Sequence, residues 1–278
     1  MIKPRHQLTL ATVRGFTLIE MIVVIVILGI VGVSSANFVS IGASVYVDAV
    51  GREQILSQSR FMMERLTREI REALPNSVRV GVSGNIHCLE FVPIVASASY
   101  VDIPVAPEAA RIGINVVQHA ITPLDATRIV IYPLSAAEVY TLDTLGGNNF
   151  TLNEVPGEGI VVQAIAFAGN VQFRADSPTQ RYYLVKNTVS YCADVSVGGS
   201  TSGQIKRYAN YWPAVGQQSP PTGITGVLMA ENLKNGIVPF TYSGATLVAN
   251  ALVKADLAFI RQGEAVAFYH EVHLVNVP

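Results

Sequence analysis

Side chains that could do chemistry are few in this sequence, and they form no catalytic pattern. The nearest to a metal-binding pair is His270-Glu-Val-His273, in a segment that is typical of a β-strand. Successive strand side chains point to opposite faces, so these two imidazoles cannot hold one ion. His87 and its neighbour Cys88 diverge for the same reason, and no Ser, His and Asp spacing resembles a triad. We therefore expect no catalytic residue, no metal and no cofactor, and we do not expect an enzyme.

Glu20 is the most informative single side chain, because it lies a few positions into a strongly apolar run. A carboxylate in hydrocarbon costs about 2.5–3.5 kcal/mol on insertion scales. It is tolerable there only if a cation neutralises it. The expected chemistry of Glu20 is therefore an ion pair in apolar surroundings.

The segment after Glu20 continues without a charge from Met21 to Val47. As a helix, these 27 residues would span about 40 Å, more than the roughly 30 Å of a bilayer core. Three basic residues and no acid precede it in residues 1–14. The positive-inside rule therefore keeps residues 1–14 in the cytoplasm and sends the rest of the chain across the membrane.

Three interpretations of this N-terminal segment are open. They are a secretory signal cut near Ser34-Ser35-Ala36, a plain signal anchor, and a prepilin-type leader. Neither a disposable signal nor an anchor has a use for Glu20. The carboxylate therefore favours the third interpretation.

The run Arg14-Gly15-Phe16-Thr17-Leu18-Ile19-Glu20 resembles the prepilin signature of type IV pilins and type II secretion pseudopilins. The resemblance implies that a prepilin peptidase cuts between Gly15 and Phe16 and that the new N-terminus, Phe16, is methylated. It also implies that Glu20 pairs with the terminal amine of a neighbouring subunit during assembly. The expected partners are the peptidase, other major and minor pilin subunits through the N-terminal helix, and the inner membrane. The chain would be a single-pass inner-membrane protein with a periplasmic C-terminal domain that later enters a pilus or pseudopilus.

Four parts follow from this interpretation: a cleaved leader (1–15), a transmembrane helix half (16–47), an amphipathic helix half (48–74) and a periplasmic β-rich globular domain (75–278). Apolar side chains recur at helical spacing through 48–74, with one interruption at Ser59, and Pro75 is expected to end the helix. The many charges of this half, Arg65 and Glu69 among them, are interpreted as a solvated face.

After Pro75 the pattern changes to short β-rich segments separated by Gly, Pro, Asn and Ser, without alternating helical periods. This predicts an α+β, pilin-like fold, in which the long helix packs on an antiparallel β-rich domain. Gly169-Asn170 is typical of a hairpin turn. Residues 93–123, 143–158 and 196–223 are expected as long surface loops. The expected strands are 86–92, 128–132, 159–168, 171–174, 181–185, 188–192, 204–208, 247–260 (broken or bent) and 265–277.

The overall charge of the chain argues against nucleic acid as a partner. The net charge is −1, so the protein has no positive electrostatic field that would attract nucleic acid.

A second resemblance indicates a more specific function. Residues 71–79, 189–194 and 272–278 resemble the O-type minor pilins of mannose-sensitive haemagglutinin pilus biogenesis, which are similar to J-type minor pseudopilins. The resemblance implies a structural subunit that helps to initiate or cap a filament. A tip adhesin, or a type II secretion pseudopilin that contacts secreted substrate, is the alternative.

Cys88 and Cys192 are the only cysteines, so they permit one disulfide at most and cannot build a four-thiolate zinc site. Both fall in expected strands of a domain that should be periplasmic, where oxidation is favoured. We therefore expect a disulfide between them. Two buried thiols that act as small apolar groups are the alternative.

Overall fold

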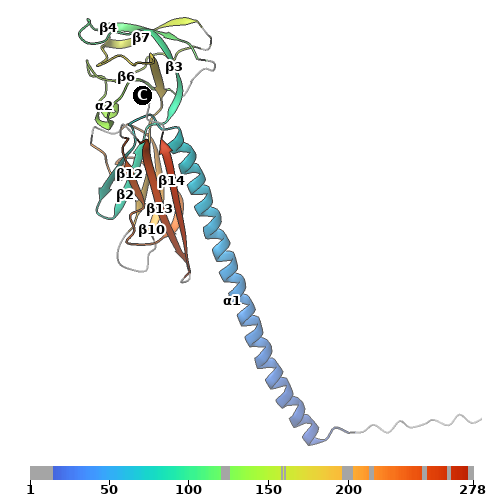
Figure 1. Ribbon diagram of the computed structural model, residues 1–278. Helices are drawn as coiled ribbons and strands as arrows, with labels where there is room; N and C mark the ends of the chain where they lie inside the picture. The colour runs from blue at the N-terminus through green and yellow to red at the C-terminus, as the bar shows by residue number, and fades with distance from the viewer. Residues whose placement is uncertain are drawn as a thin grey trace, which may run out of the picture. The chain divides into compact units, whose positions relative to one another are not determined.

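The computed structural model of the chain describes residues 15–119, 126–157, 159, 161–195, 203–212, 216–245, 249–261 and 264–274. The chain divides between Gly51 and Arg52 into two units, and each is described by itself. One helix, α1 (Leu18–Arg71), runs from the first unit into the second, and all the strands belong to the second (Figure 1).

The second unit contains two antiparallel sheets. The larger sheet has the strand order β1-β2-β9-β10-β11-β13-β12, and β14 also pairs with β13. Its strands are β1 (Arg79–Ser83), β2 (Ile86–Phe91), β9 (Thr188–Asp194), β10 (Gly203–Tyr211), β11 (Val227–Leu233), β12 (Phe240–Ser243), β13 (Ala251–Arg261) and β14 (Glu264–Leu274).

The smaller sheet has the order β6-β5-β8-β3-β4-β7. It is accompanied by a short helix, α2 (Ala136–Tyr140), whose first turn is capped by the Ser135 side chain. Its strands are β3 (Ile94–Asp102), β4 (Arg111–Val117), β5 (Arg128–Ile131), β6 (Asn149–Thr151), β7 (Val162–Val171) and β8 (Arg181–Val185).

The smaller sheet is an insertion into the larger one. β2 and β9 are hydrogen-bonded neighbours, with Phe91 opposite Val189 at one end of their ladder. All six strands of the smaller sheet lie between these two strands in the sequence. The insertion therefore leaves and rejoins the larger sheet at one place.

The part of α1 that belongs to the second unit packs on one face of the larger sheet. Its buried side chains recur every three or four positions, which is the pattern of an amphipathic helix. They pack against Leu89, Phe91 and Tyr191 of β2 and β9. Full burial of a side chain such as Leu66 contributes roughly 1.5–3 kcal/mol. The buried positions of this part of the helix are Ile55, Ser59, Met62, Met63, Leu66 and Ile70.

A polar group, the Glu69 carboxylate, lies in this contact. The prediction that the charged face of the helix is solvated is therefore wrong at Glu69. The Glu69 carboxylate accepts hydrogen bonds from Arg65 Nε at 2.9 Å, Arg207 Nε at 2.9 Å and the Tyr191 hydroxyl at 3.0 Å. Burial alone would raise the pKa of Glu69, but the hydrogen bonds from Arg65 and Arg207 hold that pKa below its ordinary value. Glu69 thus joins α1 to β9 and β10.

The α+β prediction is confirmed, with a long N-terminal helix and an antiparallel β-rich domain. The helix ends at Arg71, three residues before the predicted Leu74. Proline disfavours helical backbone in the residue before it, and Leu74 precedes Pro75. Leu74 N–H instead donates to the carbonyl of Val92 at 2.8 Å.

Several local predictions are wrong. Gly169-Asn170 forms no hairpin, because β7 runs through it; a register shift lets β4 pair with β7 on both sides, Gly113 opposite Ala166 and Arg111 opposite Val171. The expected loop 93–123 contains β3 and β4, whose Ala, Ser and Gly residues weaken the apolar alternation. The expected loop 143–158 contains β6, and β1, β11, β12 and α2 lie outside the predicted elements. Residues 1–14 of the predicted leader lie outside the described residues. So do residues 160, 247–248 and 275–277 of three predicted strands, and residues 120–123, 158, 196–202 and 213–215 of the predicted loops.

Candidate functional site

The N-terminus of α1 is built by a local capping pattern. Thr17 precedes the first helical residue, and its hydroxyl oxygen accepts a hydrogen bond from Glu20 N–H at 3.3 Å. Thr17-Leu18-Ile19-Glu20 has the spacing of a capping box, in which a Ser or Thr cap stands three residues before a Glu. Glu20 also lies in the first turn, where the positive end of the helix dipole favours an acid. This geometry explains why the helix begins at Leu18.

The helix that follows presents its apolar side chains outward. From Phe16 to Val50 every residue of this unit is exposed, and the Phe16 side chain is 80% exposed. By length and composition α1 contains one candidate membrane span, none of which is buried within the protein. Burial of this surface therefore requires lipid or another protein chain.

The predicted site residues fall in two different units of the chain. Gly15, Phe16 and Glu20 belong to the first unit, and both cysteines belong to the second. A Cβ atom added at Gly15 would meet nothing within 4 Å. In the part of the chain that the structure describes, the Glu20 carboxylate has no ion-pair partner.

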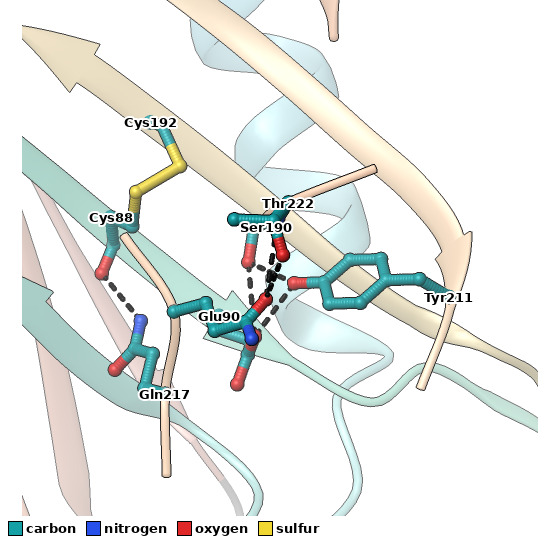
Figure 2. Close-up of a disulfide and its surroundings, with 8 residues drawn as sticks. Cys88, Glu90, Ser190, Cys192, Tyr211, Gln217 and Thr222 are labelled. Atoms are coloured by element: carbon teal, nitrogen blue, oxygen red, sulfur yellow. Dashed lines mark hydrogen bonds between the residues drawn. A yellow bond between two sulfur atoms is a disulfide. The ribbon is translucent and has the colours of Figure 1, made fainter. Parts of the chain in front are cut away.

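Cys88 and Cys192 form a disulfide in the structure, between the neighbouring strands β2 and β9 (Figure 2). The two residues are direct cross-strand partners with a Cα–Cα distance of 4.0 Å. Val195 N–H donates to the Asn85 carbonyl, so by alternation along the ladder the cysteine pair is a non-hydrogen-bonded one, where side chains lie closest. Gln217 Nε2 donates to the Cys88 carbonyl at 3.0 Å.

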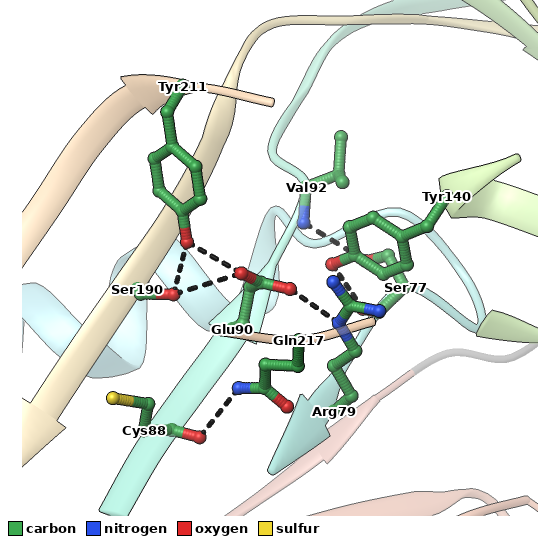
Figure 3. Close-up of polar contacts among 9 residues, drawn as sticks. All are labelled: Ser77, Arg79, Cys88, Glu90, Val92, Tyr140, Ser190, Tyr211 and Gln217. Carbon is green, nitrogen blue, oxygen red and sulfur yellow. Dashed lines mark hydrogen bonds and ion pairs between the residues drawn. The ribbon is translucent and has the colours of Figure 1, made fainter. Parts of the chain in front are cut away.

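A buried polar cluster lies beside the disulfide, on the sheet face opposite α1. Glu90 is fully buried and forms an ion pair with Arg79 of β1 (Figure 3). Its other oxygen accepts hydrogen bonds from Tyr211 at 2.6 Å and Ser190 at 3.4 Å. Burial, and then the nearby Glu90 charge, raise the pKa of the Tyr211 hydroxyl well above its ordinary value.

This cluster also connects the two sheets. The Arg79 guanidinium lies 3.6 Å from the ring centroid of Tyr140, which comes from α2. The Tyr140 hydroxyl donates to the Ser77 carbonyl at 2.9 Å. Both Glu90 oxygens accept hydrogen bonds from side chains of the fold. The arrangement fits a structural link.

Sequence reasoning did not find the Glu90 cluster. Its members come from separate strands and a helix, and only the three-dimensional pairing places them together. The one available signal was Glu90 itself, a lone charge in the apolar strand segment Ile86–Phe91.

Metal binding finds no support in the described residues, which contain no group of three or more His, Cys, Asp or Glu side chains suited to an ion. His270 and His273 lie on opposite faces of β14, one half-buried and the other exposed. The two imidazoles therefore point away from each other, as their spacing in a strand predicts.

Comparison with protein families gives one finding. Residues 10–36 match the family model described as the prokaryotic N-terminal methylation motif. The chain therefore carries a prepilin-type motif at its N-terminus, which supports the type IV pilin and pseudopilin class. Searches of curated proteins and of solved structures gave no match.

Proposed function

We propose that this chain is a minor pilin or pseudopilin, a structural subunit that helps to initiate or cap a type IV pilus of the mannose-sensitive haemagglutinin type. The observation that carries the proposal is the methylation motif at residues 10–36, placed at the start of a helix with an uncharged, fully exposed run. A structural subunit needs no catalytic group. It acts through the exposed apolar surface of α1, which contacts the membrane and other subunits.

Processing is the first step of the proposed function. A prepilin peptidase cuts between Gly15 and Phe16, and the new amine of Phe16 is methylated. Space around Gly15 and the exposure of Phe16 are compatible with access by an enzyme. The processed chain stays in the inner membrane through the apolar part of α1, with residues 75–278 in the periplasm.

Assembly is the second step. Glu20 neutralises the terminal amine of an adjacent subunit, while the apolar side chains of α1 pack against other pilin helices. A carboxylate and an ammonium that neutralise each other in apolar surroundings are each tolerable where neither is alone.

Mass spectrometry of the mature N-terminus tests the proposal. The expected result is a chain that begins with N-methylated Phe16, whereas a Gly15→Leu variant stays unprocessed. A mature N-terminus near Asn37 would establish a cleaved secretory signal and overturn the proposal.

Deletion of the gene tests the role within the class. Loss of all filaments supports the initiating or capping role. Normal filaments that no longer attach to their target would transfer the role to a tip adhesin, and normal filaments with impaired protein secretion would transfer it to a secretion pseudopilin.

A further inference from the structure

A pocket of about 330 Å³ lies where the chain returns from the smaller sheet to the larger one. β8 ends at Val185 and β9 begins at Thr188, so Lys186 and Asn187 form the connection between the two sheets. Both residues line the pocket, together with Arg207 of β10. Pockets that hold small molecules ordinarily have volumes of about 300–1,000 Å³, so this one is large enough for such a ligand.

The described residues that line this pocket include two cations and no carboxylate. The Lys186 side chain is half-buried, and its Nζ atom has no hydrogen-bond or ion-pair partner in the described part of the chain. Arg207 donates to Glu69 through Nε at 2.9 Å, and Arg65 donates to the same carboxylate. Three cations therefore face a single anion in this region, which leaves an excess of positive charge at the pocket.

Two carboxamides add to the hydrogen-bond donors of the pocket. Asn187 Oδ1 accepts from the Thr127 hydroxyl at 3.4 Å, and its Nδ2 group has no acceptor among the described residues. The pairing of β10 with β9 shifts register between Ala209 and Tyr211, which makes Asn210 a bulge with a φ of 63°. A bulge redirects a side chain, and asparagine tolerates a positive φ. Asn210 also lines the pocket.

We propose that this pocket binds a small organic acid, whose carboxylate is held by Lys186 and Arg207. An ammonium, a guanidinium and two carboxamides supply N–H donors, and a carboxylate accepts several hydrogen bonds without donating any. The planar guanidinium fits carboxylate geometry in particular.

The volume of the pocket favours an organic ligand over an inorganic ion. A water molecule takes about 30 Å³ in the liquid, so a pocket of about 330 Å³ has room for roughly ten non-hydrogen atoms. An inorganic ion such as sulfate would fill only part of this space.

The inference goes beyond the proposed function, because a filament subunit requires no small-molecule ligand. It concerns residues of the second unit only. A failed processing test at Gly15 would therefore leave it in place, and a failed binding test would leave the proposed processing and assembly unaffected.

Isothermal titration calorimetry of the full-length protein in a non-ionic detergent tests the proposal, at constant ionic strength so that screening does not vary. The probes are malate and glucuronate, and malamide, the uncharged diamide of malate, is the matched control ligand. We expect saturable binding of the acids, and binding of malamide that is weaker by about tenfold or more, because it offers no charged acceptor.

Variants of one lysine make the test specific to the pocket. Lys186→Met should weaken binding of the acids by about tenfold or more and leave the thermal unfolding temperature of the free protein unchanged. Lys186→Arg keeps the positive charge and should retain binding. Lys206→Met is the matched control, because Lys206 precedes Arg207 in β10 and its side chain points to the other face of the sheet.

Three outcomes would overturn the proposal. They are the absence of saturable binding by both acids, equal binding of malate and malamide, and equal affinities of Lys186→Met and Lys206→Met for the acids. Inorganic sulfate is the last probe, because binding as tight as that of the organic acids would show that the pocket takes a free ion and would also overturn the proposal.

Discussion

At the scale of single residues, Glu20 and Glu90 are both carboxylates that need a cation to neutralise them in apolar surroundings. Glu90 is fully buried, and Arg79 from the adjacent strand neutralises it within the fold. Glu20 begins an apolar helix, and the described residues contain no ion-pair partner for it. The proposed function supplies this partner as the terminal amine of an adjacent subunit.

The first prediction concerns Glu20. Glu20→Ala should leave insertion, cleavage and folding intact but reduce incorporation into filaments, because a neighbouring ammonium is left unpaired. Glu20→Gln should be nearly as defective, since an amide carries no charge. Immunoblots of sheared filaments, made after cleavage has been confirmed by mass spectrometry, measure incorporation. A fully processed Glu20→Ala chain at the normal filament level would restrict Glu20 to a role in processing.

The second prediction concerns His119. Its side chain is buried against Tyr182, and Nε2 has no hydrogen-bond partner within the described residues. Burial lowers the pKa of His119 below the ordinary 6.5. The unfolded chain therefore binds the proton more readily, and stability should fall as pH drops below 6.5, by at most about 1.4 kcal/mol per pH unit.

The measurement is urea unfolding of the wild type and of His119→Gln from pH 7.5 to 5. The difference between the two free energies of unfolding should change with pH only below about 6.5. His273→Gln, at an exposed position of β14, is the control. A pH-independent difference would show that the His119 ring is not kept neutral by the fold.

At the scale of elements, the third prediction concerns the contact between α1 and the larger sheet. Glu69→Gln should lower the free energy of unfolding by about 1.5–3 kcal/mol, because hydrogen bonds from two arginines lose their charged acceptor. Glu64→Gln, at an exposed position on the same helix, should have little effect. Chemical denaturation followed by circular dichroism measures both, and equal stabilities of the two variants would contradict the prediction.

The pH dependence of this contact has a definite sign. The pKa of Glu69 in the folded chain lies below its ordinary value of 4.5, so its contribution is complete above that value. The contribution should disappear as pH falls through the lower folded pKa. Glu69→Gln should therefore be less acid-sensitive than the wild type in that range.

Elements with strong local patterns were predictable from the sequence. The uncharged run and the helical spacing up to Ile70 locate α1, and strands such as Arg181–Val185 match their expected bounds. β3, β4 and β7 were missed or misdivided, because Ala, Ser and Gly carry little periodic signal and their strand character depends on long-range pairing. Of the candidate sites, the N-terminal signature is contiguous and visible in sequence, whereas the Glu90 cluster is assembled from distant positions.

At the scale of the whole molecule, the fourth prediction concerns the disulfide. Cys88 and Cys192 are 104 positions apart in sequence, and the loop between them contains the smaller sheet. Closing a loop of about 100 residues contributes roughly 4.7 kcal/mol in the entropic description. Cys192→Ala should therefore lower the free energy of unfolding by about 2–5 kcal/mol, measured by denaturation without reductant.

A double variant, Cys88→Ala with Cys192→Ala, is the control, since added reductant should not change its stability. Quantitative alkylation of both cysteines in unreduced, denatured protein would rule the bond out.

The insertion of the smaller sheet also sets an order of events during synthesis. β2 is complete at Phe91, but its neighbour β9 begins only at Thr188. During synthesis from the N-terminus, β3 to β8 can therefore pair with one another while the edge of β2 that later binds β9 is still unpaired. Strand pairings between positions this distant in sequence form slowly. Cys192 reaches Cys88 only when β9 joins β2. Oxidation of this pair thus records that β9 has joined β2. A pulse-labelled chain should acquire protease resistance in the smaller sheet before it acquires the bond.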